Sequence, residues 1–280
     1  ISAAKLKGKR VLVRLDLNVP FVRGRVMGDY RLRQSIPTLE FLRKAGAKII
    51  IISHYDVEFS KTLRPIATHM RKFFSVGFVP DITGPRVLKM IQGMRNGDAL
   101  ILENLRTDPR EEKNSRAFAQ ELASYADIYV NEAFSVSHRA HASIMGVPQY
   151  LPSFIGFLFD KECKALTPLR NPAKPFALIL GGAKFETKLP LLRYYLSKTS
   201  YIILGGALAN TFFKEQGFEM GKSVVAKKIS GLKPFLKNKK ISLPTDVVLS
   251  TGSLRRPEKL LSTEKIPDIG PEKVEHIKKV

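Results

Sequence analysis

The hydrophobic and polar positions of the chain alternate between two periods, which predict strands separated by helices. Residues 10–19 alternate apolar and polar side chains, as a strand does, with Arg14 on the polar face. The apolar face of this segment consists of Val11, Val13, Leu15 and Leu17. A helix follows, with Gly46 as its stop, and then the continuous apolar run 47–54 predicts a strand buried on both faces.

The same alternation continues along most of the chain. Further strands are expected at residues 76–80, 99–102, 127–130, 176–180, 201–204 and 245–250. Helices are expected near residues 63–73, 85–94, 115–125, 188–197 and 207–216. Strands and helices that alternate at this spacing predict an α/β fold with two Rossmann-like lobes, in which parallel sheets are flanked by helices.

A domain boundary is expected in the middle of the chain. Residues 157–172 are expected to link the lobes as a helix. The helical pattern stops before Asn171-Pro172 at the end of this segment, because a proline disfavours helix at the residue before it. This linking helix separates a first lobe, residues 1–156, from a second, partial lobe, residues 173–280.

Composition limits the function without selecting one. The 280 residues include 44% hydrophobic residues, yet no apolar run approaches the roughly 18 residues of a membrane span. The single cysteine, Cys163, allows no internal disulfide and suits a reducing cytoplasm. The net charge of +22 attracts anions of every kind, and residues 227–240 carry six lysines without an acid. A solvated surface explains that lysine run as well.

Polar residues gather where the predicted strands of the first half end. In doubly wound sheets, ligands bind beyond the carboxyl ends of the strands. The residues at these ends, or in the loops beside them, are Asp16, Asn18, Arg31, Ser53, His54, Glu103, Asn104, Arg106, Asn131, His138 and Arg139. Arginine forks pair with carboxylate or phosphate, so converging arginines predict a small, multiply charged anion as ligand.

Glycine pairs end two strands of the second half. Gly181-Gly182 lets the backbone approach a ligand closely, and the helix start that follows directs free N–H groups toward it. Lys184 and Lys188 add two positive charges. This is a common way to hold phosphates, although the Walker A pattern is absent.

Each feature also has an ordinary structural explanation. Asp16 and Asn18 suit the wet face of an edge strand, and His54 suits a strand cap. Glu103 and Arg106 suit a surface ion pair. His138 and His141 lack the further ligands that would complete a metal site, so no protein-bound metal is expected.

Read in order, several segments resemble phosphoglycerate kinase. They are VLVRLDLNVP (11–20), GDYRLRQSIPTLEFLRKAGAKIIIISH (28–54), ENLR (103–106), YVNEAFSVSHRAHAS (129–143), LGGAKFETK (180–188), LGGALANTFF (204–213), LPTDVV (243–248) and DIGPE (268–272). The resemblance covers essentially the whole chain. It implies a glycolytic, ATP-dependent phosphotransferase that works in the cytoplasm as a monomer on 3-phosphoglycerate and 1,3-bisphosphoglycerate, with Mg-ATP or Mg-ADP in the second lobe.

The resemblance also implies a role for each matching residue. Asp16 and Asn18 would contact the carboxylate and hydroxyl end of the substrate, while Arg31 would meet the transferring phosphoryl group. The residues expected at the distal phosphate are His54, Arg106 and Arg139. Those expected at the nucleotide are Gly182, Lys184, Lys188, Gly205 and Gly206, with Lys184 also stabilising the migrating group. Closure of the two lobes would bring Arg31 and Lys184 to that group.

Three departures from the family pattern bear on activity. The family reads His-Leu-Gly-Arg-Pro where this chain reads His54-Tyr55-Asp56-Val57, which loses an arginine and is expected to weaken substrate binding. Ala207 replaces a glycine and is expected to crowd the adenine. The family's acidic ribose segment and GGGDT turn do not occur within residues 1–280, so the second lobe is expected to be truncated and the activity of this chain stays open.

Two other functions compete with this one. The strong positive charge and the missing turn allow a catalytically impaired relative that binds RNA or another polyanion. The lysines lack interleaved aromatic residues, which disfavours this alternative. A kinase for a different small molecule on the same scaffold is the other alternative.

Overall fold

The computed structural model describes residues 5–22, 25–56, 60–227 and 231–279. The chain divides into two compact units, Ile1–Thr167 and Pro168–Val280, and each is described here by itself. The division follows helix α6 (Phe157–Leu166). Within the described ranges, no helix has both the length and the apolar character that crossing a membrane requires.

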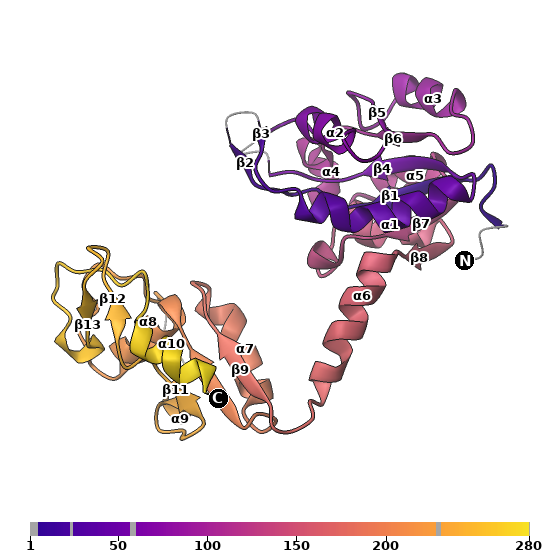
Figure 1. Ribbon diagram of the computed structural model, residues 1–280. Coiled ribbons are helices and arrows are strands. Elements are labelled where there is room, and N and C mark those ends of the chain that lie inside the picture. Colours follow the sequence, from indigo (N-terminus) through magenta and orange to yellow (C-terminus); the bar gives the residue numbers. More distant parts are fainter. Residues whose placement is uncertain (1–4, 23–24, 57–59, 228–230, 280) are drawn as a thin grey trace. The chain divides into compact units, whose positions relative to one another are not determined.

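The first unit is built on a parallel six-stranded sheet with the order β5-β6-β4-β1-β7-β8 (Figure 1). Its strands are β1 (Arg10–Arg14), β4 (Lys48–Ile52), β5 (Gly77–Phe78), β6 (Ala99–Ile101), β7 (Ile128–Asn131) and β8 (Ser153–Ile155). A short antiparallel hairpin pairs β2 (Phe21–Val22) with β3 (Arg25–Val26). Since β4 pairs with one side of β1 and β7 with the other, β1 lies at the switch point where such sheets bind ligands.

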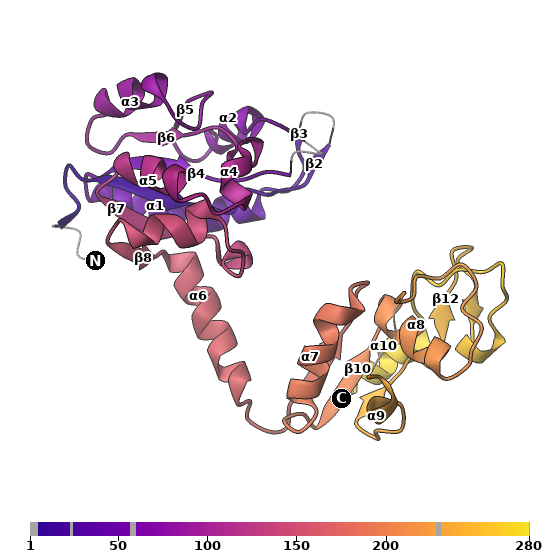
Figure 2. The same cartoon turned by 180° about the vertical axis from the view of Figure 1, so that it is seen from behind.

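Helices cover both faces of this sheet (Figures 1 and 2). The helices are α1 (Tyr30–Lys44), α2 (Arg64–Met70), α3 (Pro85–Gln92), α4 (Pro109–Glu112) and α5 (Arg116–Ser124). On one face, α1 and α2 pack on the sheet in a core that includes Val13, Leu39, Ile51 and Met70. On the other, α3 and α5 pack in a core that includes Leu12, Ile50, Ile91 and Phe118. The run at residues 47–54 is therefore buried on both sides, as predicted.

The alternation at residues 10–19 predicts that β1 has a polar face exposed to water, and this prediction is wrong. The strand ends at Arg14, and Leu12 and Arg14 are both fully buried. The cause is the central position of β1, because a strand with neighbours on both sides and helices on both faces is buried beyond its first residue, Arg10. The edge-strand explanation for Asp16 and Asn18 is wrong for the same reason.

The second unit contains a parallel three-stranded sheet with the order β11-β10-β9. Its strands are β9 (Ala177–Leu180), β10 (Tyr201–Leu204) and β11 (Ile241–Ser242). The helices are α7 (Phe185–Tyr195), α8 (Gly206–Glu215), α9 (Lys233–Leu236) and α10 (Pro271–Lys278). The core includes Phe185, Leu192, Ile202 and Phe212, so α7 and α8 are held against the sheet by their apolar faces.

Residues 245–250 contain a shorter strand than the pattern predicts. Only β12 (Val247–Val248) forms there, and it belongs to a separate antiparallel sheet with β13 (Leu254–Arg255) and β14 (Asp268–Ile269). The chain reverses at Gly252, whose φ of +84° suits glycine, and the Leu249 N–H donates to the Ser253 carbonyl at 2.8 Å. This local turn interrupts the alternation of strand and helix.

A buried carboxylate ties β7 to the start of α6. Glu132, which directly follows β7, is 1% exposed. Its Oε1 accepts from the Leu158 N–H at 3.1 Å and from the Thr38 hydroxyl, and its Oε2 accepts from the Phe159 N–H at 3.0 Å. Glu132 therefore caps the free N–H groups of this helix.

We predict that Gly156→Ala destabilises the first unit. A Cβ at Gly156 would lie 2.3 Å from Glu132 Oε2, and the helix cap holds that carboxylate in place. The free energy of unfolding in urea should fall by about 1–3 kcal/mol. Gly93→Ala is the control, because its φ is −76° and the nearest atom to a Cβ is 3.6 Å away. Equal stability of the two variants would contradict the prediction.

Candidate active site

The site of the first unit begins where β1, β4 and β7 end. Arg14 is in register with Ile52 on one side and with Asn131 on the other. The residues that follow these three strands therefore emerge at one edge of the sheet. Asp16 and His54 come from two of these segments. The sequence prediction of a shared edge is confirmed for them.

A buried arginine and histidine lie at the centre of this edge. Arg14 is 0% exposed and His54 is 3% exposed. Arg14 Nη2 lies 3.0 Å from His54 Nδ1, and Arg14 Nη1 donates to the Leu15 carbonyl at 2.6 Å. Sequence reasoning did not select Arg14 as a site residue. The available signal was an arginine placed between two apolar residues, Val13 and Leu15.

Two predicted arginines, Arg106 and Arg139, influence the charge of His54. Burial, together with the positive charges of Arg14, Arg106, Arg139 and His141, lowers the pKa of His54 to about 2. Arg106 and Arg139, the other two residues expected at the distal phosphate, therefore act electrostatically on His54. His54 is neutral there, which makes it a hydrogen-bonding group among cations.

Arg106 is held in place by its own turn. It lies in the 3₁₀ turn Leu105–Thr107, where the Asn104 side chain accepts from the Arg106 N–H at 3.1 Å. Its guanidinium lies 3.9 Å from Asp56 and 3.4 Å from Glu112. The Arg106 Nε atom, which is the atom 3.4 Å from Glu112, is buried and makes no hydrogen bond among the described residues. Such a donor is suited to an anionic ligand. Val57, the other residue of the family departure, lies outside the described residues.

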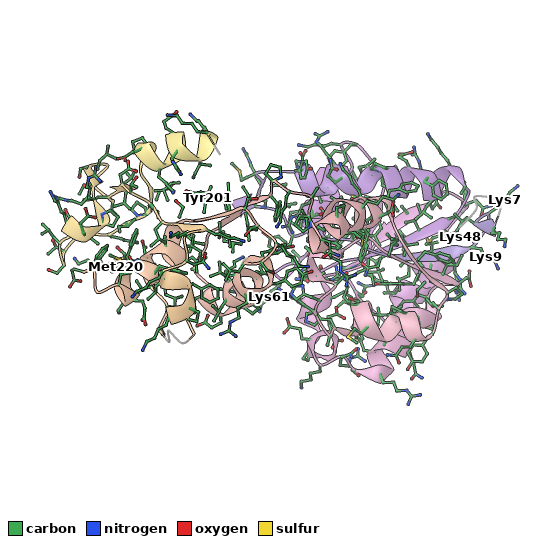
Figure 3. All side chains as sticks on the ribbon, turned by 90° about the horizontal axis from the view of Figure 1, so that it is seen from below. Lys7, Lys9, Lys48, Lys61, Tyr201 and Met220 are labelled. Carbon is green, nitrogen blue, oxygen red and sulfur yellow. The ribbon has the colours of Figure 1, made fainter. Side chains whose placement is uncertain are left out.

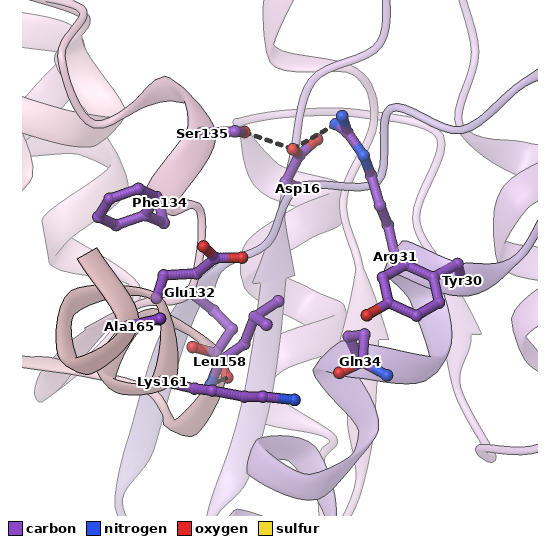
Figure 4. Close-up of a pocket in the computed structure, with 11 residues that line it drawn as sticks. Asp16, Tyr30, Arg31, Gln34, Glu132, Phe134, Ser135, Leu158, Lys161 and Ala165 are labelled. Carbon is purple, nitrogen blue, oxygen red and sulfur yellow. Dashed lines mark hydrogen bonds and ion pairs between the residues drawn. The ribbon is translucent and has the colours of Figure 1, made fainter. Parts of the chain in front are cut away.

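Asp16 and Arg31 form a second group beside this cluster (Figure 4). Asp16 Oδ2 accepts from Arg31 Nη1 at 2.5 Å and from Ser135 Oγ at 2.5 Å, while Oδ1 accepts from the Asn18 N–H at 3.1 Å. The Arg31 side chain is 49% exposed, so it remains accessible. The two residues border a pocket of about 270 Å³. Its other lining residues are Tyr30, Gln34, Glu132, Phe134, Ser135, Leu158, Lys161, Glu162 and Ala165.

The geometry bears on two further expectations, the surface ion pair of Glu103 with Arg106 and the metal site. Glu103 accepts from the Thr62 hydroxyl and the Leu63 N–H, both at 2.7 Å, and Arg106 has other acidic neighbours. Within the described ranges, no group of three or more histidine, cysteine or acidic side chains is placed to hold a metal ion.

In the second unit, two strand-to-helix turns lie against each other. Gly181-Gly182 follows β9 and Gly205-Gly206 follows β10. A Cβ at Gly206 would lie 3.6 Å from the Gly182 nitrogen, and one at Gly181 would lie 3.5 Å from the Gly205 oxygen. Positive φ angles at Gly182 (+106°) and Gly206 (+56°) suit glycine at both turns.

These turns present two helix starts to a ligand. Neither α7 nor α8 has a side-chain cap at its N-terminus. Their N–H groups are therefore open to an anion. Lys184 stands at the start of α7 and is exposed, and Lys188 follows one turn later and is half-buried. The predicted glycines and lysines are thus placed together within this unit.

The basic residues are not concentrated at these sites. Lys7, Lys9 and Lys48 lie at the opposite end of the first unit, before β1 and at the start of β4 (Figure 3). In the lysine run, Lys240 Nζ donates to the carbonyls of Leu196 at 3.0 Å and Thr199 at 2.9 Å. Lys228 lies outside the described residues. Part of the positive charge therefore lies on ordinary surface, and part of it, as at Lys240, makes hydrogen bonds within the fold.

The fold and the site define an α/β protein of the anion-binding class, with one side-chain site and one backbone site. The family model for phosphoglycerate kinase matches residues 1–280. The phosphoglycerate kinase of Coprothermobacter proteolyticus is 39% identical over 305 residues, which cover 99% of this chain and 76% of that protein. The Moorella thermoacetica enzyme is 41% identical over 289 residues, covering 96% and 74%. The chain belongs to the phosphoglycerate kinase family.

Solved structures of the same family resemble this one. Phosphoglycerate kinase from Pyrococcus horikoshii matches with a TM-score of 0.86 at 28% identity, covering 98% of this chain and 76% of that one. The enzyme from Coxiella burnetii matches with a TM-score of 0.74 at 31% identity, covering 98% and 75%. The fold class and the family resemblance inferred from the sequence are confirmed.

We predict that His54 makes the protein less stable in acid. The folded-state pKa of His54, about 2, lies below the value of about 6.5 for an unfolded chain, so below pH 6.5 only the unfolded state gains the proton. The free energy of unfolding should therefore fall by about 1.4 kcal/mol per pH unit near pH 5 from this group. Urea unfolding measured from pH 8 to pH 5 tests this. The free energy of unfolding of His54→Gln should depend less steeply on pH than that of the unaltered protein. Identical slopes would refute it.

Proposed function

We propose that this protein is a phosphoglycerate kinase that transfers a phosphoryl group reversibly between 1,3-bisphosphoglycerate with ADP and 3-phosphoglycerate with ATP. The observation that carries the proposal is the buried pair of Arg14 and His54, 3.0 Å apart beyond the end of β1, with Arg106 and Arg139 acting on the charge of His54. Such a concentration of cations at a sheet switch point is suited to a small ligand with several negative charges.

The two groups of the first unit would hold opposite ends of the substrate. His54, Arg106 and Arg139 are suited to the distal phosphate, because they combine two guanidinium forks with a neutral hydrogen-bonding ring. Asp16 and Asn18 are suited to the hydroxyl and carboxylate end, where Asp16 would accept a hydrogen bond from the hydroxyl. Arg31 adjoins Asp16 and is suited to the phosphoryl group that moves.

The turns of the second unit would hold the nucleotide. Gly182, Gly205 and Gly206 allow the backbone to approach the ligand, and the open N–H groups of α7 and α8 are suited to its phosphates. Lys184 and Lys188 add charge there. Mg²⁺ would arrive with ATP or ADP and reduce the charge of their phosphates. Ala207 is half-buried in the first turn of α8, and its effect on the adenine stays a prediction.

Phosphoryl transfer needs mainly positioning and charge stabilisation from a protein. In the transition state, negative charge spreads over the three equatorial oxygens of the moving group. The Arg31 guanidinium and the Lys184 ammonium would stabilise that charge, while the remaining residues hold donor and acceptor in line. The transfer therefore requires both units to act on one phosphoryl group.

The setting of this activity is also part of the proposal. The single cysteine, Cys163, suits a reducing cytoplasm, and small molecules rather than nucleic acid are the expected partners of a single chain. Neither the structure nor the relatives support the RNA-binding alternative. The lysine run that suggested it partly serves the fold, as the bonds of Lys240 demonstrate.

We predict that Arg31→Ala and Lys184→Ala each lower kcat by roughly 100- to 1,000-fold, since each removes a cation from the transition state. A coupled assay with ATP, Mg²⁺ and 3-phosphoglycerate measures the effect. Arg95→Ala and Lys259→Ala remove exposed charges elsewhere in each unit and should leave kcat unchanged. Full activity in both site variants would reject the proposed function, and turnover of a different acid in a substrate panel would favour another small-molecule kinase.

A further inference from the structure

A fully buried carboxylate lies behind the site and has no part in the mechanism above. Glu111, on the short helix α4, is 0% exposed. Its Oε2 accepts from the Ser143 N–H at 2.9 Å, and its Oε1 accepts from the Ser143 hydroxyl at 2.6 Å. Burying a carboxylate is costly unless hydrogen bonds and a nearby positive charge compensate it. Ser143 supplies the hydrogen bonds.

The compensating charge belongs to Arg14. Arg14 Nε donates to Ser143 Oγ at 2.9 Å. A hydroxyl has one hydrogen, and Ser143 gives it to Glu111, so an oxygen lone pair of Ser143 faces Arg14. Burial lowers the pKa of Arg14, and the negative charge of Glu111 is the strongest influence against that effect. The bonds therefore run in one direction, from Arg14 through Ser143 to Glu111.

The same guanidinium determines where His54 carries its proton. Arg14 Nη2 lies 3.0 Å from His54 Nδ1. A guanidinium has donors and no acceptor, so Nδ1 must present its lone pair to Arg14. The proton of a neutral His54 then resides on Nε2, and this N–H is the donor left for a ligand.

The surroundings keep His54 in the neutral form. The groups that act on its charge are Arg14 from β1, Arg106 from the turn after β6, and Arg139 and His141 from the segment after β7. With burial, they hold the pKa of His54 at about 2. His141 in turn lies 3.9 Å from Glu111 Oε1, so Glu111 is the carboxylate shared by this cluster.

We propose that Glu111 and Ser143 are positioning residues that act through Arg14 to hold His54 as the Nε2–H tautomer, which donates to the distal phosphate of the substrate. The part of this inference that concerns the substrate rests on the proposed function. The part that concerns the tautomer rests on the hydrogen bonds alone. Charge at the site then comes from arginines, and His54 contributes a directed donor. Recognition of the phosphate becomes independent of histidine protonation.

The kinetic test uses Glu111→Gln. The two donors of Ser143 bind different oxygens of Glu111, and in glutamine one of these atoms becomes an NH₂ donor, so one hydrogen bond is lost and Arg14 loses its counter-charge. The KM for 3-phosphoglycerate should rise about tenfold or more, while the KM for ATP stays unchanged. Ser143→Ala should behave alike, and Ser143→Thr, which keeps the hydroxyl, should recover most of the loss. An unchanged KM for 3-phosphoglycerate in Glu111→Gln would overturn the proposal.

A matched variant separates positioning from stability. Tyr125 is 2% exposed and its hydroxyl accepts from the Gly84 N–H at 3.1 Å, on the α3 and α5 side of the first unit. Tyr125→Phe breaks one partly buried hydrogen bond, and it should lower stability without raising the KM for 3-phosphoglycerate. An equal rise of that KM in Tyr125→Phe would assign the effect of Glu111 to lost stability and overturn the positioning role.

The spectroscopic test needs no substrate. Long-range ¹H–¹⁵N NMR spectra of ¹⁵N-histidine protein report the tautomer of each of the 5 histidines, and His54→Gln identifies the His54 signals. His54 should be the neutral Nε2–H form from pH 5 to pH 9, and should lose this fixed state in Glu111→Gln.

The combined outcomes distinguish the two proposals. An active kinase in which His54 titrates in this range, or carries its proton on Nδ1, overturns the inference alone. A fixed Nε2–H tautomer in a protein without kinase activity rejects the proposed function, and with it the role of His54 toward substrate.

Discussion

The guanidinium of Arg14 stands at the end of the central strand, between two layers of helices and away from water. A charge in that position must be met by hydrogen bonds and by an opposite charge. Its partners come from separate parts of the chain: Leu15 beside it, His54 after β4, and Ser143 after β7, with Glu111 of α4 behind Ser143. Satisfying one side chain therefore assembles the segments that form the site.

In the proposed function, the two units offer phosphate groups two different kinds of environment. The first uses side chains, with guanidinium groups that keep their charge and a neutral imidazole whose proton is placed by its neighbour. The second uses backbone, with glycine turns that bring two uncapped helix starts together. A small rigid substrate suits directed side chains, and a chain of phosphates suits repeated N–H groups.

The end of β7 links the site to the last helix of the first unit. Glu132 lies between the pocket beside Asp16 and the first turn of α6, whose N–H groups it accepts. Thr38 of α1 donates to the same carboxylate and accepts from the Phe157 N–H at 2.9 Å. The orientation of α6 within this unit is therefore set by residues that also border the pocket.

The sequence by itself determined the features that depend on neighbouring residues. Apolar runs identified buried strands such as β4, glycine pairs located the turns after β9 and β10, and the family motifs carried the resemblance that the comparisons confirmed. Parallel strands end at a common edge, so polar residues at their ends, including His54 and Arg106, were recognisable in advance. The antiparallel sheet around β12 was not, because a turn and two distant strands create it.

Only the tertiary structure decided how Arg14 is used. Its hydrogen bond to Ser143 joins residues 129 positions apart, and Ser143 reaches Glu111 across 32 positions. No local pattern marks such pairs, since a period of two or of 3.6 residues records which face is apolar and not which polar groups meet in the interior. Arg14 occupies an ordinary polar position in the sequence pattern, and its burial in the fold places it at the centre of the site.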